Sequence, residues 1–337
     1  MTYRFKLEEP VSQGVRRIGL EQIDIAAAKL GSKDDIPASI HDARRCLKRL
    51  RALLRLIRPG LSDAVYRREA EALAATGRLL SGARDLFVMQ QTLTKLEGRV
   101  GSLPNGAADR LRKLLANGHA RSRRSGADPR RQALQRLDQA RRLFTGKAAG
   151  GIELEHVSDG LEAEYRKARK TFRHAYRDAT DEAFHAWRKK VQLHWRHMSL
   201  ISRGWPEALS ARASEAKELS RLLGEDHDYA VLLDFAGAAR LQPSDLAELV
   251  DRCRACQADL RAQARPRGDR LFAERAGDLK KRIALYWASA GHLAALPPAQ
   301  EQQPAKRHGA RQLGSGKRVP RQRSSRRLKR EGRGADG

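Results

Sequence analysis

The sequence predicts an all-α protein whose two halves repeat one helical plan. Aromatic residues make up only 5% of the 337 residues, and the apolar residues recur at intervals of three and four, which is typical of amphipathic helices. A basic helix that begins with a histidine occurs twice, with matching flanks. A repeat of this length indicates two related domains or half-domains, not a solenoid.

The first half is expected to hold six helices, which are interrupted by Pro59-Gly60, by Ser81-Gly82 and by a loop at 98–106. Their expected ranges are 11–30, 36–58, 63–80, 84–96, 107–124 and 129–144. The glycine-rich segment 146–151 is expected to be flexible. It gives the predicted boundary between a first half, residues 1–148, and a second half, residues 149–296.

The second half repeats the plan, and a basic tail follows it. The expected helices are 154–177, 181–202, 207–223, 228–239, 243–264 and 268–289. Residues 297–337 contain few apolar side chains that could build a core, so we expect a disordered tail. A tail rich in lysine and arginine can contact a polyanion such as nucleic acid.

The whole chain carries a formal charge of +28 and has a pI near 10.9. A charge of this size favours a polyanionic partner, namely nucleic acid, an anionic membrane surface or a phosphate polymer.

The helix expected at 36–58 has one cationic and one apolar face. At about 100° per residue, one face lies within roughly 80° and comprises His41, Arg44, Lys48, Arg51 and Arg55. The apolar face is centred roughly 120° away and comprises Ala43, Leu47, Leu50, Leu54 and Ile57. No acid offsets the cations, and like charges four apart oppose helix formation. The stripe therefore indicates an anion site, although a solvated basic face is the common alternative.

The second copy of the basic helix spans 181–202. The offset from His41 to His185 equals that from Leu56-Ile57 to Leu200-Ile201. The cations expected on its face are His185, Arg188, Lys189 and Arg196, and those expected on the first helix also include Arg45 and Arg49. Gln192, Trp195 and Ser199 replace the first copy's Lys48, Arg51 and Arg55. We therefore expect the first half to bind an anion more strongly.

The two His-x-x-Arg motifs, together with Arg84-Asp85-Leu86 and Gly224-Glu225-Asp226-His227-Asp228, resemble the CHAD domain, the conserved histidine α-helical domain. The resemblance covers residues 10–295. It implies two helical bundles related by pseudo-twofold symmetry around a basic cavity, and it implies binding of inorganic polyphosphate. It does not imply catalysis.

Asp85 and Asp228 follow the motif helices in corresponding places. We interpret them as structural acids that orient arginines of the motif helix in their own halves, because buried charges must be paired. His41 and His185 have no acidic or cysteine partner nearby in sequence that would support metal binding or nucleophilic chemistry. As donors near the start of a basic helix, they suit phosphate binding.

No metal or cofactor is predicted. Cys46 is expected to face the core, and Cys253-x-x-Cys256 lacks a second ligand pair with zinc spacing. Trp187 lies on the apolar side of its helix, and we interpret it as a core residue, not as a base-stacking platform. The sequence has neither an apolar run long enough to span a bilayer nor an N-terminal signal core. We expect a cytoplasmic protein, with association to polyphosphate granules as a further expectation.

The leading functional hypothesis is non-catalytic binding of inorganic polyphosphate. The first alternative is a nucleic-acid-binding protein, although no zinc finger, RNP aromatics or basic zipper is present. The second is an accessory protein or enzyme of triphosphate metabolism. The N-terminus lacks the Glu-x-Glu-x-Lys strand of CYTH-type triphosphatases, and the chain lacks a P-loop. The oligomeric state is left open.

Overall fold

The computed structural model describes residues 3–32, 35–101, 106–124, 128–238 and 241–295, without the side chains of 82–85 and 118–124. The described residues form helices and connecting segments with no strand, so the predicted all-α class is confirmed. Met1–Leu296 form one compact unit. The predicted disordered tail, 297–337, lies outside the described residues.

The helices agree with the predicted ones over much of the chain. Their bounds are α1 (Val11–Gly31), α2 (Ile36–Leu56), α3 (Asp63–Leu79), α4 (Gly82–Val100), α5 (Ala107–Arg124), α6 (Pro129–Thr145), α7 (Lys147–Gly150), α8 (Leu154–Asp178), α9 (Asp181–Leu200), α10 (Pro206–Ala238), α11 (Pro243–Leu271) and α12 (Ala276–Ala295), with 3₁₀ turns η1 (Arg58–Gly60) and η3 (Ser202–Gly204). The predicted boundary at 148 and 149 falls inside the short helix α7, and the division into halves stays a prediction.

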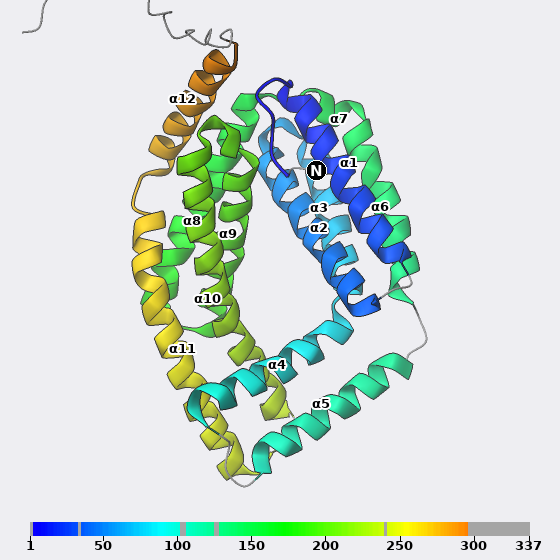
Figure 1. The fold of residues 1–337 in the computed structure, drawn as a ribbon, viewed down its shortest axis with the longest axis vertical. Helices are drawn as coiled ribbons and strands as arrows, with labels where there is room; N and C mark the ends of the chain where they lie inside the picture. Colours follow the sequence, from blue (N-terminus) through cyan, green and yellow to red (C-terminus); the bar gives the residue numbers. More distant parts are fainter. Residues whose placement is uncertain (1–2, 33–34, 102–105, 125–127, 239–240, 296–337) are drawn as a thin grey trace, which may run out of the picture. The chain divides into compact units, whose positions relative to one another are not determined.

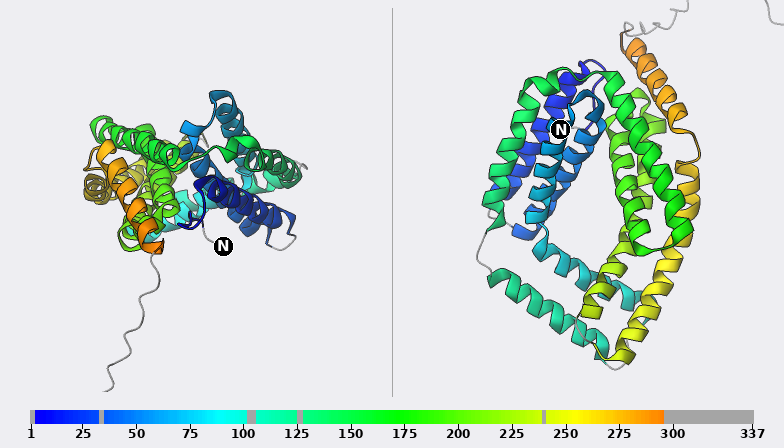
Figure 2. Two further views of the ribbon diagram at one scale, coloured as in Figure 1. Left: turned by 90° about the horizontal axis from the view of Figure 1, so that it is seen from above. Right: turned by 180° about the vertical axis from the view of Figure 1, so that it is seen from behind.

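The helices of the compact unit form two groups. Helices α1, α2, α3 and α6 pack on one another, and α8, α9, α10 and α11 form the second group (Figure 1). The view from behind shows the same grouping, with α4 and α5 crossing near the lower ends of both groups (Figure 2). The two groups meet where α2 packs against α8 and α9, and α4 also packs against α10 and α11 of the second group. The two motif helices, α2 and α9, are therefore neighbours.

Two predicted helix breaks in the second half are wrong. Helix α10 runs unbroken through Gly224, where a break at 224–227 was expected. Helix α11 runs unbroken through Pro266, where a break at 265–267 was expected. A glycine inside a helix costs about 1 kcal/mol relative to alanine, and tertiary packing readily offsets a cost of that size. Here α10 packs along both α9 and α11.

Helix α2 forms as the sequence predicts. The Asp35 side chain caps its start by accepting a hydrogen bond from the backbone N–H of Ala38 at 3.1 Å, and Pro37 occupies the first turn, where no backbone donor is needed. The predicted apolar face is buried throughout, and so is Cys46. The cationic face of α2 lies outside this core, where its side chains are partly buried or exposed.

Helix α8 crosses α2 at very short range. A Cβ atom added at Gly160 would lie 1.8 Å from the backbone oxygen of Leu56. Only glycine permits this approach, because any side chain would collide with the backbone of α2. The crossing brings the next turn of α8, which carries Glu164, next to the C-terminal part of α2.

The N-terminal segment forms a strap across both motif helices. The Tyr3 hydroxyl donates to the backbone oxygen of Arg49 on α2 at 2.9 Å. The Phe5 N–H donates to the backbone oxygen of Leu200 on α9 at 2.8 Å. The Phe5 ring is buried and lies edge-on to Trp287 of α12, with centroids 6.5 Å apart. The strap therefore connects α2, α9 and α12.

Candidate functional site

The predicted cationic stripe of α2 faces helices of both groups. Arg44, Lys48, Arg51 and Arg55 are partly buried, whereas His41 is exposed. Arg44 donates from Nη1 to the backbone oxygen of Gly77 on α3 at 3.0 Å. Because α2 begins at Ile36, His41 lies in the second turn and not the first. The helix dipole acts mainly on the first turn, so it contributes less at His41 than the sequence predicts.

Arg45 and Arg49 have contacts on the side of α2 that faces α1. Arg45 is exposed and pairs with Asp42 at 3.2 Å, and Asp42 in turn pairs with Lys29 of α1 at 3.3 Å. Arg49 donates from Nη1 to Gln22 of α1 at 3.2 Å. The structure thus gives Arg45 and Arg49 structural partners that the sequence pattern did not indicate.

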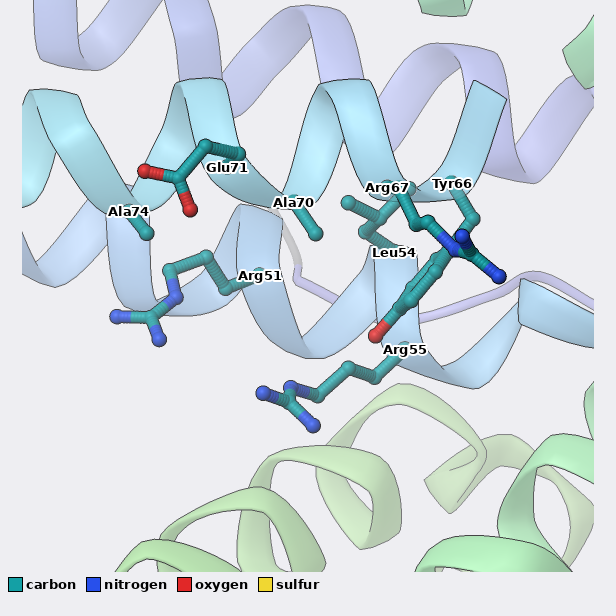
Figure 3. A pocket seen from close by; sticks show the side chains of 8 residues that line it. All are labelled: Arg51, Leu54, Arg55, Tyr66, Arg67, Ala70, Glu71 and Ala74. Carbon is teal, nitrogen blue, oxygen red and sulfur yellow. The ribbon is translucent and has the colours of Figure 1, made fainter. Parts of the chain in front are cut away.

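The C-terminal end of the stripe lines a pocket of about 410 Å³ between α2 and α3. Its lining residues are Arg51, Leu54, Arg55, Tyr66, Arg67, Ala70, Glu71 and Ala74. Figure 3 shows the Arg51 and Arg55 side chains along one edge of the pocket, with Arg55 nearer to the helices of the second group. Two of the predicted site residues therefore share a pocket.

The surroundings of Arg51 in this pocket disfavour its positive charge. Burial lowers its pKa, and the nearby positive charges of Arg55 and Arg78 lower it further. Among the described side chains no carboxylate forms an ion pair with Arg51. A partly buried cation beside other cations is stabilised when an anion binds.

A buried carboxylate, that of Glu164, pairs with cations of α2, α8 and α9. Glu164 of α8 accepts hydrogen bonds from Lys167 and from Lys190 of α9, both at 2.9 Å. Arg55 of α2 approaches the same carboxylate at 3.9 Å. The bonds from the two lysines lower the pKa of Glu164 to about 2 against the opposing effect of its burial. Glu164 is therefore an ionised counter-ion shared by three helices.

Arg196 is the most buried of the predicted cations, with 7% of its surface exposed. It donates to the backbone oxygen of Gln192 at 2.6 Å and lies over the Trp195 ring at 4.2 Å, while its Nε has no hydrogen-bond partner among the described residues. Burial lowers the pKa of Arg196 to about 10, and the charges of Arg49, Arg51 and Arg188 also lower it.

Because Arg49, Arg51 and Arg188 all act on the charge of Arg196, cations of both motif helices lie within electrostatic range of one another. Arg49 and Arg51 come from α2, whereas Arg188 and Arg196 come from α9. Lys189 is exposed on α9. Cations of both motif helices therefore lie near one another, and their role as one binding site stays a prediction.

His185 stacks on His227 of α10, with ring centroids 4.0 Å apart. Burial lowers the pKa of both rings to about 4, and the adjacent cations Arg188 and Lys189 act in the same direction. Both rings are therefore neutral at pH 7. In the second copy the motif histidine can offer a neutral donor to a ligand, but it adds no charge.

Of the two predicted structural acids, the structure describes the side chain of Asp228 but not that of Asp85. The side chain of Asp85 lies outside the described residues, so its role stays a prediction. Asp228 is partly buried on α10, and its role also stays a prediction. The neighbouring Asp226, which was not singled out, accepts a hydrogen bond from Arg261 of α11 at 2.6 Å.

Four residues of the site were missed by the sequence reasoning. These are Tyr66 and Arg67 of the pocket, Lys190 beside Glu164, and His227 against His185. A signal for His227 was available, because it lies in the segment Gly224–Asp228, which is one of the motifs that carry the family resemblance. Tyr66 and Arg67 carried no comparable signal.

The described residues contain no group of three or more His, Cys, Asp or Glu side chains that could hold a metal ion. The three cysteines are buried and free. Among the described helices none is long and apolar enough to cross a membrane.

The profile of the CHAD domain matches residues 20–237. The chain belongs to the CHAD domain family. Among solved structures, PptA from Streptomyces chartreusis resembles this CHAD protein with a TM-score of 0.54 at 15% sequence identity. The similarity covers 79% of this chain and 100% of that chain, and at such identity it concerns the fold alone. No curated protein matches the sequence.

Proposed function

We propose that this CHAD protein binds inorganic polyphosphate between its two motif helices without catalysing a reaction on it. The observation that carries the proposal is that Arg49 and Arg51 from α2 and Arg188 from α9 lie within electrostatic range of the buried Arg196 of α9. Guanidinium groups hold phosphate oxygens through forked hydrogen bonds, and lysines such as Lys48 and Lys189 add point charges. A polymer with one charge per phosphate can satisfy such a row of cations in register.

A binding role suits the acid at the site better than a catalytic one. Glu164 is engaged by Lys167 and Lys190, and its pKa of about 2 keeps it ionised. A carboxylate with these properties neutralises cations and is poorly matched to proton transfer near pH 7. In cells, such binding would concentrate the protein at polyphosphate granules.

The test is a calorimetric titration of long-chain polyphosphate into the full chain at physiological ionic strength. The site variant is Arg44→Glu/Lys48→Glu/Arg51→Glu. The matched control is Arg131→Glu/Arg275→Glu/Lys281→Glu, which changes the net charge equally at exposed positions on α6, on α12 and just before it. We expect binding to be lost in the site variant and retained in the control, and to weaken steeply as salt rises.

Single-stranded RNA is then added as a competitor. Polyphosphate that stays bound in the presence of excess RNA supports a site built for phosphate. Equal losses in the site and control variants, or ready displacement by RNA, would overturn the proposal. The second result would assign the basic surface to nucleic acid instead.

A further inference from the structure

The pocket between α2 and α3 has two kinds of wall. Guanidinium groups of Arg51, Arg55 and Arg67 supply positive charge, whereas Leu54, Ala70 and Ala74 supply apolar surface. Figure 3 shows Tyr66 and Arg67 at one end of the pocket and Glu71 and Ala74 at the other, with the two α2 arginines along one edge. The pocket therefore combines an anion-binding side with an apolar side.

Inorganic polyphosphate would use only the cationic side. A phosphate placed against the carbon atoms of Leu54, Ala70 and Ala74 would lose water without gaining donors, which is unfavourable. The Glu71 carboxylate would also repel a phosphate. It accepts a hydrogen bond on Oε1 from Arg78 at 2.5 Å, and its side chain is 70% exposed.

A ligand that matches both sides carries several phosphates on an organic body with hydrogen-bond donors. The pocket volume of about 410 Å³ lies in the range of roughly 300–1,000 Å³ that is typical of small-molecule sites. The Tyr66 ring is held in place by the guanidinium of Arg58, which lies 4.8 Å from the ring centroid. The tyrosine thus gives the pocket a fixed aromatic wall.

We propose that this pocket binds a nucleoside triphosphate. The triphosphate lies against Arg51, Arg55 and Arg67, and the base packs on the apolar wall beside Tyr66. Glu71 accepts a hydrogen bond from an amino group of the base or from a ribose hydroxyl. This goes beyond the proposed function, because it names a second ligand class that shares Arg51 and Arg55 with the polymer.

The test compares metal-free ATP with inorganic tripolyphosphate, since the two carry similar charge and differ in the nucleoside. Each is titrated calorimetrically into the full chain. We expect ATP to bind at least roughly fivefold more tightly. Ala70→Leu fills the apolar side and is expected to weaken ATP binding at least roughly tenfold. The matched control is Ala64→Leu, at an exposed position of the same helix outside the pocket.

Glu71→Gln gives a second, independent readout that does not depend on filling the pocket. Loss of the negative charge is expected to tighten tripolyphosphate binding and to weaken the preference for ATP. Equal affinity of the wild type for the two ligands, or an Ala70→Leu variant that folds and keeps the ATP preference, would overturn the inference. Long-chain polyphosphate is titrated in parallel. If its binding persists while the ATP preference is absent, only this inference fails, and if its binding is absent, the proposed function fails.

Discussion

Helices α2 and α9 carry copies of one motif, and they differ in what surrounds them. The α2 residues Arg51 and Arg55 line a pocket, while the apolar side of α2 is buried. On α9, Trp187 is fully buried and stacks near Phe172 with ring centroids 4.9 Å apart. His197 of α9 is also buried and donates from Nε2 to the backbone oxygen of Ala52 on α2 at 3.0 Å.

The comparison shows that two copies of one motif can bury their polar side chains to different degrees. The first copy presents charge, whereas the second is packed among the helices of its own group, contacts α2 and adds a few cations near those of α2. Four predictions test this division of roles, beginning with the largest expected effect.

Trp187→Ala is expected to destabilise the protein by about 3–5 kcal/mol, because it removes a buried aromatic side chain and leaves a cavity. Arg45→Ala, at an exposed position of α2, should change stability by about 0.5 kcal/mol or less. Chemical denaturation followed by circular dichroism measures both. A Trp187→Ala loss below about 1 kcal/mol would contradict a core role for α9.

Acid is expected to destabilise the fold through the buried histidines of α9. Burial lowers the pKa of His197 to about 4, whereas an unfolded histidine titrates near 6.5. The unfolded state therefore binds a proton that the folded state excludes. The stabilisation is complete above about pH 6.5 and is lost as pH falls toward 4, by about 3 kcal/mol for this group.

Thermal unfolding midpoints between pH 7.5 and 4 measure this effect. His197→Gln keeps a donor for the Ala52 carbonyl and removes the titrating group, so its midpoint should decline less steeply. The decline should not vanish, because His194 is also buried and its pKa lies well below the usual value. Parallel curves for the variant and the wild type would refute the assignment to His197.

The two copies should also differ in ligand binding. Lys48→Gln/Arg51→Gln on α2 is expected to weaken polyphosphate binding by about 3 kcal/mol, roughly a hundredfold in Kd, because two charged contacts are lost. Arg188→Gln/Lys189→Gln on α9 is expected to weaken it roughly tenfold. Calorimetry on both double variants gives the ratio. Equal losses would show that the copies contribute equally to the site.

The smallest effect is expected at the strap that joins the two copies. Tyr3→Phe removes the hydroxyl that donates to the Arg49 backbone oxygen at 2.9 Å, which should cost about 1 kcal/mol of stability. Polyphosphate affinity should stay within about twofold, because no ligand contact is assigned to Tyr3. Denaturation and titration of the same variant separate the two effects, and a large loss of affinity would place the strap in the binding site.

Two helix breaks that the sequence predicts in the second group are absent, because tertiary packing can outweigh the local effect of glycine or proline on a helix. Gly224 was expected to end a helix, yet it lies inside α10, where an added Cβ would meet the Arg188 guanidinium at 3.7 Å. That distance is an ordinary van der Waals contact, so this position does not require glycine. At Gly268, which lies inside α11, an added Cβ would instead lie 2.6 Å from the Phe172 ring. The signal for a helix break and the signal for close packing are the same residue, so a local pattern cannot distinguish them.

The sequence by itself determined the all-α class, the buried apolar face of α2, the duplication of the motif helix and membership of the CHAD family. These properties follow from helical periodicity and from short motifs, which are local. Only the tertiary structure decided that Glu164 holds Lys190 near Arg55, that Arg196 is buried, and that Tyr66 completes a pocket with Arg51. Burial and charge pairing depend on side chains far apart in the chain, and their partners are fixed only when the helices pack.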